Sequence, residues 1–298
     1  MKTKTINNFS TSNSPIASLN LGEKVIVEVL DKFNGQLTYN NENISSLKAD
    51  KLNPATGPFY IRNTYPEEIL VVNIHQLTAE SIGVSTVFPD LGVLGEKIEK
   101  PESFFYNLDF NTIGIEEGKI EFTPFISIIG TTPNKLISTG VPANHGGKVD
   151  CPNLKQGCKI LLPIFQEGSL LALGGIKAMQ GFGQVAGTGI ECGGEIAFSC
   201  NKTTIEALKT PMVISEEGYE ILASHYNLEK AIHMATEQWC YLLEDICGFS
   251  FPKSYHYLSI ASNLSIVQLV NPNVTVSLSI HKSIILDKLK LFFSLLDK

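Results

Sequence analysis

The sequence predicts a mainly β protein with one pair of helices near its C-terminus. Short apolar runs of strand type, separated by glycine, proline, asparagine and aspartate, recur through most of the chain. Only the segment from Asn227 to Gly248 has a clear helical pattern. No internal repeat or low-complexity linker divides the 298 residues. We therefore expect a single domain, with a β body over about residues 1–210 and a helix pair with closing strands over about residues 211–298.

The expected strands follow one another with turn residues between them. Residues 1–18 are polar and predict a loose arm or an edge strand. Asn53–Pro58 forms a turn cluster, and Glu116–Gly118 predicts a hairpin turn. The apolar or alternating runs that predict strands are 24–30, 59–61, 69–74, 104–110, 119–122, 124–130, 160–165, 169–173, 195–200, 265–270 and 274–280.

The helix after Asn227 has signals at both ends. Asn227 is suited to the N-cap, and Gly248 is suited to the position just after the last turn. An apolar stripe at helical spacing predicts that the Trp239 face is buried against a sheet. A second helix is expected from Ser250 or Pro252 toward Asn263, and the amphipathic tail 286–295 predicts a third. The stripe consists of Leu228, Ala231, Ile232, Ala235, Trp239, Leu242 and Ile246.

Composition excludes several classes of protein. The formal net charge of −7 argues against a nucleic-acid-binding surface, which needs a basic face. The N-terminus has no apolar core of a signal peptide, and no apolar run is long enough to cross a bilayer, so no membrane partner is expected. None of the six cysteines forms a Cys-x-x-Cys pair. We expect reduced thiols in a cytoplasmic protein.

The stretch from Asn144 to Glu195 is unusually rich in glycine. Glycine is costly in backbone entropy, so its clusters usually mark positive φ angles or close backbone approach. Between these clusters lie the apolar runs 160–165 and 169–173, which read as strands. Polar residues on glycine-shaped turns at strand ends are typical of a binding or catalytic site on a β scaffold.

This stretch resembles the acetamidase/formamidase family of amide hydrolases, and the likeness covers nearly the whole chain. The Asn53–Pro58 turn and the region of Asp31, Gly35 and Gln36 are also similar to that family. The resemblance implies a β-sandwich-like body with a smaller α+β portion, hydrolysis of short linear amides with release of ammonia, and a homo-oligomer. The matching residues within the stretch are His145, Gly146, Gly147, Asp150, Leu162, Pro163, Gly174, Ala178, Gln180, Gly181, Gly183, Gly187, Thr188 and Glu191.

The resemblance also implies a site. Amide hydrolysis needs an activated water, a stabiliser for the oxyanion and an acid for the leaving amine, and a metal can supply the first two. His145 and Asp150 would hold a divalent metal, zinc or calcium, together with Glu191 and, as a further candidate, Asp31. Glu191 would act as general acid or base, and Gln180 would complete the catalytic set. We expect these side chains other than Asp31 to converge on one pocket, with Asp31 and Asn53 as neighbours.

Several departures from the family pattern argue against a metal site. Gly175 stands where the family has Asp, Lys177 where it has His, and Gln184 where it has Glu. Lys148 replaces an Asn. One hypothesis is that a lysine ammonium occupies the place of a metal and pairs with Asp150 or Glu191. The alternative is that both lysines point to solvent.

Function therefore stays open between two classes at this point. The first is an amide hydrolase that takes a small amide substrate, with weak metal binding and reduced or absent activity. The second is a non-catalytic protein on the same fold that binds a small ligand or serves as a scaffold. Cys151 and Cys192 adjoin the motifs and are candidates for a nucleophile, although buried free cysteines are far more common.

Overall fold

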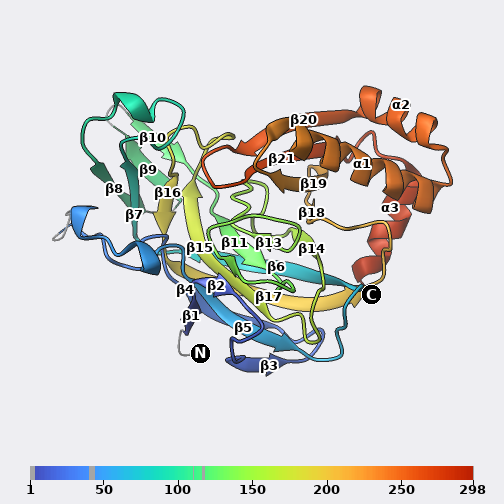
Figure 1. The fold of residues 1–298 in the computed structure, drawn as a ribbon, viewed down its shortest axis with the longest axis horizontal. Helices are drawn as coiled ribbons and strands as arrows, with labels where there is room; N and C mark the ends of the chain where they lie inside the picture. The colour runs from blue at the N-terminus through green and yellow to red at the C-terminus, as the bar shows by residue number, and fades with distance from the viewer. Residues whose placement is uncertain (1–3, 40–43, 110, 116–117, 298) are drawn as a thin grey trace.

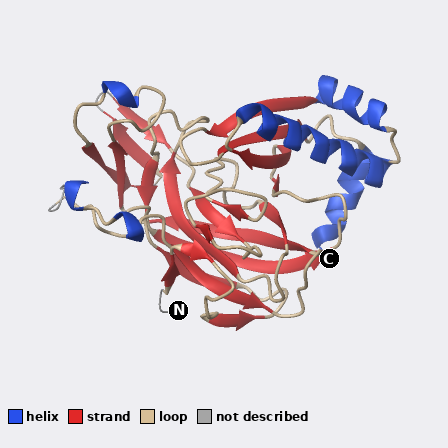
Figure 2. Ribbon diagram, viewed as in Figure 1, coloured by secondary structure: helices blue, strands red, loops and turns tan. Residues whose placement is uncertain are grey.

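Two large β-sheets pack face to face, with helices at one end of the molecule (Figures 1 and 2). A computed structural model describes residues 4–39, 44–109, 111–115 and 118–297. The mainly β class, the helix pair near the C-terminus and the expected strands are confirmed. Residues 116 and 117 of the expected hairpin turn lie outside the described residues. The strand after them, Gly118–Glu121, pairs with an additional strand at Thr112–Ile115 and not with the strand expected at 104–110.

The first sheet carries most of the candidate site. In the described part of the chain it has 11 strands, and its main path runs β1-β5-β15-β16-β7-β8-β9-β10. β11 pairs with β15 and β13, and β3 pairs with β5. The bounds are β1 Thr5–Ile6, β3 Ala17–Leu19, β5 Ala55–Ile61, β7 Ile82–Val87, β8 Glu102–Asp109, β9 Thr112–Ile115, β10 Gly118–Glu121, β11 Phe125–Gly130, β13 Gly146–Gly147, β15 Leu171–Met179 and β16 Ile190–Cys192.

The second sheet joins the middle of the chain to its C-terminal part. Its 8 described strands run β20-β21-β19-β18-β14-β6-β17-β4. The closing strands thus extend the sheet of the β body instead of forming a separate one. The bounds are β4 Val25–Val29, β6 Ile69–Ala79, β14 Lys159–Pro163, β17 Gly194–Thr203, β18 Met212–Ile214, β19 Gly218–His225, β20 Ser262–Gln268 and β21 Val274–His281, and a small separate pair joins β2 Asn8–Phe9 to β12 Ile137–Ser138.

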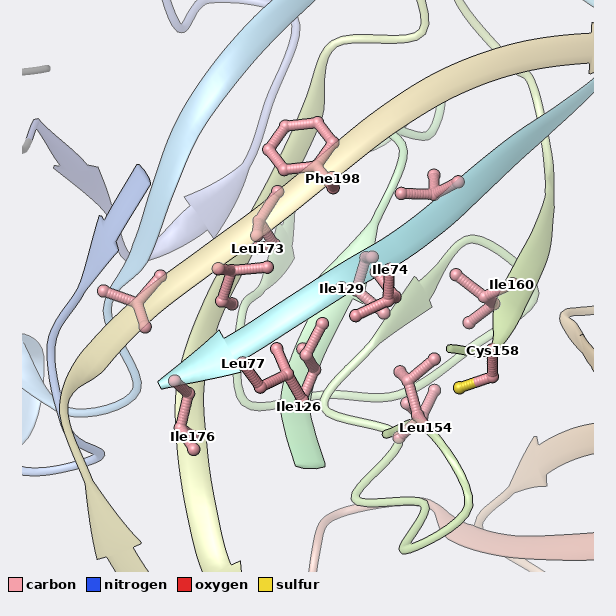
Figure 3. Packing of buried hydrophobic residues seen from close by; sticks show 14 of the residues in the cluster. Ile74, Leu77, Ile126, Ile129, Leu154, Cys158, Ile160, Leu173, Ile176 and Phe198 are labelled. Carbon is pink, nitrogen blue, oxygen red and sulfur yellow. The ribbon is translucent and has the colours of Figure 1, made fainter. Parts of the chain in front are cut away.

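The main core lies between the two sheets. Phe59 and Leu173 from the first sheet belong to one buried cluster with Ile74 and Phe198 from the second. Figure 3 shows Leu173, Ile74 and Phe198 of this cluster. The Phe59 and Phe198 rings pack edge to face, with centroids 5.9 Å apart. Alternation along each strand sends one set of side chains into this layer, which explains why the short apolar runs became strands.

The long helix begins and ends where the sequence indicates. α1 spans Leu228–Cys247, and the Asn227 side chain accepts a hydrogen bond from the backbone N–H of Lys230. Gly248 takes the left-handed conformation at φ 69°, which satisfies the last carbonyls at little steric cost. α1 lies against β19 and β21, and the buried Trp239 donates its indole N–H to the carbonyl of Leu278 at 2.7 Å.

Two further helices complete the C-terminal layer. α2 spans Phe251–Ala261 with Ser250 at the N-cap, and α3 spans Asp287–Ser294 with Leu289 and Phe293 buried. None of the helices in the described ranges has the length and apolarity needed to span a bilayer. Short 3₁₀ segments occupy Ile44–Ser46, Ala49–Lys51, Gly95–Lys97 and Leu295–Asp297.

Candidate active site

A buried lysine stands at the centre of the glycine-rich stretch. Lys177 lies on β15, directly opposite Glu191 of β16. Its ammonium nitrogen is 2.7 Å from Asp150 Oδ1 and 3.2 Å from Glu191 Oε1, and these three side chains are completely buried. Lys177 also donates a hydrogen bond of 2.6 Å to Gln180 Oε1. The ammonium therefore has one oxygen neighbour for each of its three protons.

Asp150 forms hydrogen bonds through its backbone N–H and through both carboxylate oxygens. It adopts a positive φ of 50° in the turn after β13, and its backbone N–H donates to the carbonyl of Ser127 at 3.1 Å. Its Oδ1 accepts the hydroxyl of Ser127 at 2.6 Å and lies 3.2 Å from the ammonium of Lys148. Its Oδ2 accepts from Asn271 Nδ2 at 2.9 Å. Both carboxylate oxygens are thus engaged.

Lys148 is the second buried ammonium. Its side chain is 2% exposed, and it donates to Ser127 Oγ at 2.8 Å as well as pairing with Asp150. The structure therefore excludes the alternative in which Lys148 and Lys177 point to solvent. It agrees with the hypothesis that lysine ammonium groups sit among the carboxylates.

Electrostatics in this cluster favour the ionised acid. Burial alone would raise the pKa of Asp150, but the Lys148 and Lys177 ammonium groups outweigh it and hold that pKa well below its usual range. Burial lowers the pKa of Lys177, and the charges of Asp150 and Glu191 oppose this change. The cluster is a set of mutually stabilised charges in a dry environment.

Glu191 differs from Asp150 in how it is held. Neither of its carboxylate oxygens accepts a hydrogen bond from any described residue, although Oε1 lies 3.2 Å from Lys177 Nζ. The contact is an ion pair without hydrogen-bond geometry. Glu191 is therefore a buried carboxylate with free lone pairs, which is a costly arrangement unless a donor reaches it.

Asp31 and Lys32 approach the cluster from the segment after β4. Lys32 donates to the carbonyl of Gly187 at 3.3 Å, and burial lowers its pKa to about 8 against the opposing charge of Glu191. Asp31 accepts backbone N–H groups of Phe33 and Gly35. Burial raises the pKa of Asp31 to about 6, and the charge of Glu191 adds to this. Both residues thus lie within electrostatic reach of Glu191.

His145 is not part of this cluster. It is 1% exposed, packs edge to face on Phe9, and neither ring nitrogen has a hydrogen-bond partner among the described residues. Burial, with a small contribution from Lys135, lowers its pKa to about 3, so the ring is neutral. No described hydrogen bond or ion pair joins it to Asp150 or Glu191. The structure gathers Asp150, Gln180 and Glu191 around Lys177 and leaves His145 outside.

The remaining sequence candidates have local roles. Gln184, at φ 48°, donates through Nε2 to the carbonyl of Gly187. Asn53 takes φ 54°, and its carbonyl accepts from the hydroxyl of Thr139. Gln180 bridges two members of the cluster, since it accepts from Lys177 and donates to the carbonyl of Asp150 at 3.0 Å.

The side chains of this site do not fit a divalent metal. A protein metal site usually offers about three ligands and an open position. Here Lys177 Nζ stands between the Asp150 and Glu191 carboxylates, and both Asp150 oxygens already accept hydrogen bonds. His145 has no described contact with these acids, and among the described residues no group of three or more His, Cys, Asp or Glu side chains could hold a metal ion. The oxygen atoms of Asp150, Glu191 and Gln180 instead surround the ammonium of Lys177.

The cysteines near the motifs have the properties of core residues. Cys151 and Cys192 are buried, and burial raises the pKa of both thiols. Since the thiolate is the reactive form, this environment opposes a nucleophilic role. All six cysteines are free thiols in the structure.

Three residues that sequence reasoning missed belong to the site: Ser127, Asn271 and Lys32. Ser127 is a polar residue inside the otherwise apolar strand β11, and that contrast is a signal that the sequence does contain. Asn271 lies in the turn between β20 and β21 and donates to both Lys148 O and Asp150 Oδ2. No local pattern connects that turn to residue 150, because the contact depends on how the two sheets pack.

Comparison with known proteins identifies relatives of this architecture. The chain matches the Acetamidase/Formamidase family over residues 2–141 and 136–287. The crystal structure of an acetamidase from Bacillus halodurans is 30% identical, covers 98% of this chain and 97% of its own, and superimposes with a TM-score of 0.90. A predicted acetamidase/formamidase from Thermoanaerobacter tengcongensis is 29% identical over 94% of each chain, with a TM-score of 0.90.

A curated relative extends the comparison to a eukaryote. A candidate formamidase of Schizosaccharomyces pombe is 26% identical in a match that covers 66% of this chain and 64% of that protein. The match therefore spans somewhat less than two thirds of the yeast protein's length. With the family match over most of its residues and the shared fold, this chain belongs to the acetamidase/formamidase family.

Proposed function

We propose that this protein hydrolyses the carbon–nitrogen bond of short linear amides, releasing ammonia, without a metal ion and at a low rate. Family membership supports the reaction class. The observation that carries the rest is the position of the Lys177 ammonium, 2.7 Å from Asp150 Oδ1 and 3.2 Å from Glu191 Oε1. A fixed positive charge takes the place that the reaction otherwise assigns to a Lewis acid.

The charges of the cluster match the polarity of an amide. A primary amide offers a carbonyl oxygen that accepts hydrogen bonds and an NH₂ group that donates them. The Lys148 and Lys177 ammonium groups would polarise the carbonyl, and a buried donor–charge arrangement acts strongly because little water screens it. The free lone pairs of Glu191 would accept a hydrogen bond from the amide N–H and so hold the leaving nitrogen in place.

Burial sets the size of the substrate. Lys177, Asp150 and Glu191 are 0% exposed, which argues against a large substrate at these side chains. Formamide and acetamide are the amides that we expect to be accepted first. The low rate follows from the strong ion pairs, because an ammonium that is already neutralised by carboxylates polarises a substrate less.

The test is ammonia release from formamide, acetamide and propionamide by the purified protein. We expect slow turnover that chelation does not remove and that added zinc or calcium does not raise. Lys177→Met and Glu191→Gln should abolish it. Lys155→Met is the matched control, because Lys155 forms a comparable 2.7 Å pair with Glu217 at the surface. Robust turnover that depends on stoichiometric zinc would overturn the proposal.

A second candidate, a non-catalytic small-molecule-binding protein, is favoured by one observation. The Lys177 ammonium already has three close oxygen neighbours, on Asp150, Glu191 and Gln180, so a substrate would have to compete with them. Calorimetric binding of acetamide with no ammonia release, even after prolonged incubation, would select this candidate.

Compartment and assembly remain proposals from sequence. We propose a cytoplasmic protein, because six unpaired cysteines suit a reducing compartment, and a homo-oligomer, which light scattering would test.

A further inference from the structure

We propose that Ser127 is the nucleophile of this site and that the reaction passes through an acyl-serine ester. This inference deepens the proposed function and rests on it. Its basis is the position of the Ser127 hydroxyl, which donates to Asp150 Oδ1 at 2.6 Å and accepts from Lys148 Nζ at 2.8 Å. A serine hydroxyl between a proton acceptor and an ammonium is an arrangement suited to nucleophilic catalysis.

The fold fixes this hydroxyl in place. Ser127 lies in the middle of β11, where the five other residues are Phe, Ile, Ile, Ile and Gly, and all six are buried. Its carbonyl accepts the backbone N–H of Asp150 at 3.1 Å, so backbone and side chain join the same two residues. A polar side chain in the core needs partners, and here the partners are two charged groups.

The residue that faces Ser127 on the neighbouring strand is a glycine. The register of β11 with β15, in which Ile126 opposes Ile176 and Ile128 opposes Gly174, sets Ser127 opposite Gly175. A carbon added at Gly175 would meet only Ser127 beyond its chain neighbours, at 3.4 Å from Cβ and 3.7 Å from Oγ. Gly175 thus places no side chain against the hydroxyl, and the Ser127 side chain faces bare backbone on that strand.

The step balances with the groups that are present. Ser127 Oγ forms a bond to the amide carbonyl carbon, the carbon–nitrogen bond breaks, and ammonia leaves. The hydroxyl proton passes to Asp150 Oδ1, which already accepts it in a hydrogen bond, and then to the leaving nitrogen. Water next cleaves the serine ester and yields the carboxylic acid and the free hydroxyl. No oxidant, reductant or metal is needed.

The neighbouring lysines have a complementary role. As the oxygen of the carbonyl gains negative charge, the Lys148 ammonium, 2.8 Å from Ser127 Oγ, would stabilise that charge. The same two positive neighbours that lower the pKa of Asp150 also make it a weak base, which agrees with slow turnover.

The experiment looks for the ester directly. The protein is incubated with p-nitrophenyl acetate, an activated acyl donor, and the modified peptide is located by mass spectrometry. In parallel, acetamide turnover is run with hydroxylamine, which converts an acyl-enzyme into a hydroxamate. We expect one acetyl group on Ser127 and hydroxamate formation. Ser127→Ala should lose both, with ammonia release lowered roughly 100-fold or more, while its melting temperature stays near that of the parent.

Two further variants separate chemistry from packing. Ser127→Cys restores a nucleophile of similar size and should form a thioester on the same residue. Ser254→Ala is the matched control, since Ser254 is a fully buried serine on α2, far from the cluster in the chain and in the fold. It should acylate at Ser127 like the parent.

The outcomes distinguish this inference from the proposed function. Ammonia release by Ser127→Ala within a few fold of the parent, with no acetyl group on Ser127 in the parent, would overturn the nucleophile while leaving the hydrolase intact. Acetylation of Ser127 without any release of ammonia from amides would support the nucleophile and overturn the amide as substrate. Absence of both activities in the folded parent would overturn both.

Discussion

Lys177 Nζ lies 2.7 Å from Asp150 Oδ1, and both side chains are completely buried. Desolvation opposes the attraction within such a pair, but removing one member leaves an uncompensated charge in the core. The pair is therefore a sensitive point of the fold.

The first prediction concerns this pair. Lys177→Met keeps the length of the side chain and removes the charge, leaving Asp150 and Glu191 as buried acids. We expect the free energy of unfolding to fall by about 3–5 kcal/mol in urea denaturation at neutral pH. Lys155→Met, which breaks the partly exposed pair with Glu217, should cost less than about 1 kcal/mol. Equal stability of Lys177→Met and the parent would mean that the cluster is not ionised.

The second prediction concerns metal. Isothermal titration of the parent with zinc or calcium should show only weak binding, because Lys177 stands between the two carboxylates that a metal would need. The combined variant Gly175→Asp, Lys177→His, Gln184→Glu and Lys148→Asn removes both ammonium groups and adds three metal-binding side chains. Its metal affinity should rise at least about tenfold, and its melting temperature should rise when metal is added. Tight stoichiometric zinc in the unmodified protein contradicts this account.

The third prediction concerns acid. Burial holds the pKa of His145 at about 3 in the folded state, against about 6.5 in the unfolded chain. A depressed pKa means that the unfolded state binds the proton first, so this contribution to stability is complete above about pH 6.5 and is lost as the pH falls toward 3. The loss should approach about 1.4 kcal/mol per pH unit. Denaturation of the parent and of His145→Asn between pH 7 and 4.5 measures it.

The variant should show a shallower decline than the parent over this range, while His233→Asn, at an exposed position on α1, should follow the parent. Asp31 titrates in the opposite sense, since its raised pKa of about 6 adds stability as the pH falls. Asp31 is unchanged in the variant, so its contribution cancels when the unfolding free energy of the variant is subtracted from that of the parent. Parallel curves would show that His145 does not titrate as its burial implies.

The fourth prediction concerns the helix layer. Ala235 is completely buried on the Trp239 face of α1, so Ala235→Asp places an unpaired carboxylate in an apolar contact. We expect a loss of about 3 kcal/mol or more in unfolding free energy. His233→Asp adds the same side chain on the exposed face of the same helix and should change stability by about 0.5 kcal/mol or less. A parent-like melting curve for Ala235→Asp would refute the docking of this face.

Local signals explain why so much of the fold could be predicted. α1 was predictable because an N-cap, a C-terminal glycine and an apolar stripe all act within a few residues of one another. Strands such as β11 and β14 were predictable because short apolar runs bounded by turn residues seldom form any other secondary structure. The order in which the strands pair was not predictable, because it depends on which segments, far apart in the sequence, pack against each other.

The candidate site shows the same division. Asp150, Gln180 and Glu191 could be named because they match the family pattern, and the hypothesis that a lysine pairs with the acids agrees with the position of Lys177. No described hydrogen bond or ion pair joins His145 to them, and its ring packs on Phe9. The role of Asn271 could not be predicted from the sequence, because the residues to which it donates hydrogen bonds lie more than a hundred positions earlier in the chain.

The contact of Asn271 with Asp150 also bears on how the protein is made. Synthesis proceeds from the N-terminus, so the carboxylate and both ammonium groups leave the ribosome long before the turn between β20 and β21. Until that turn docks, Asp150 Oδ2 and the carbonyl of Lys148 lack the amide that caps them in the finished molecule. The last strands therefore complete the hydrogen bonds of the cluster. A nascent chain released before residue 271 would lack the amide that binds Asp150 and Lys148.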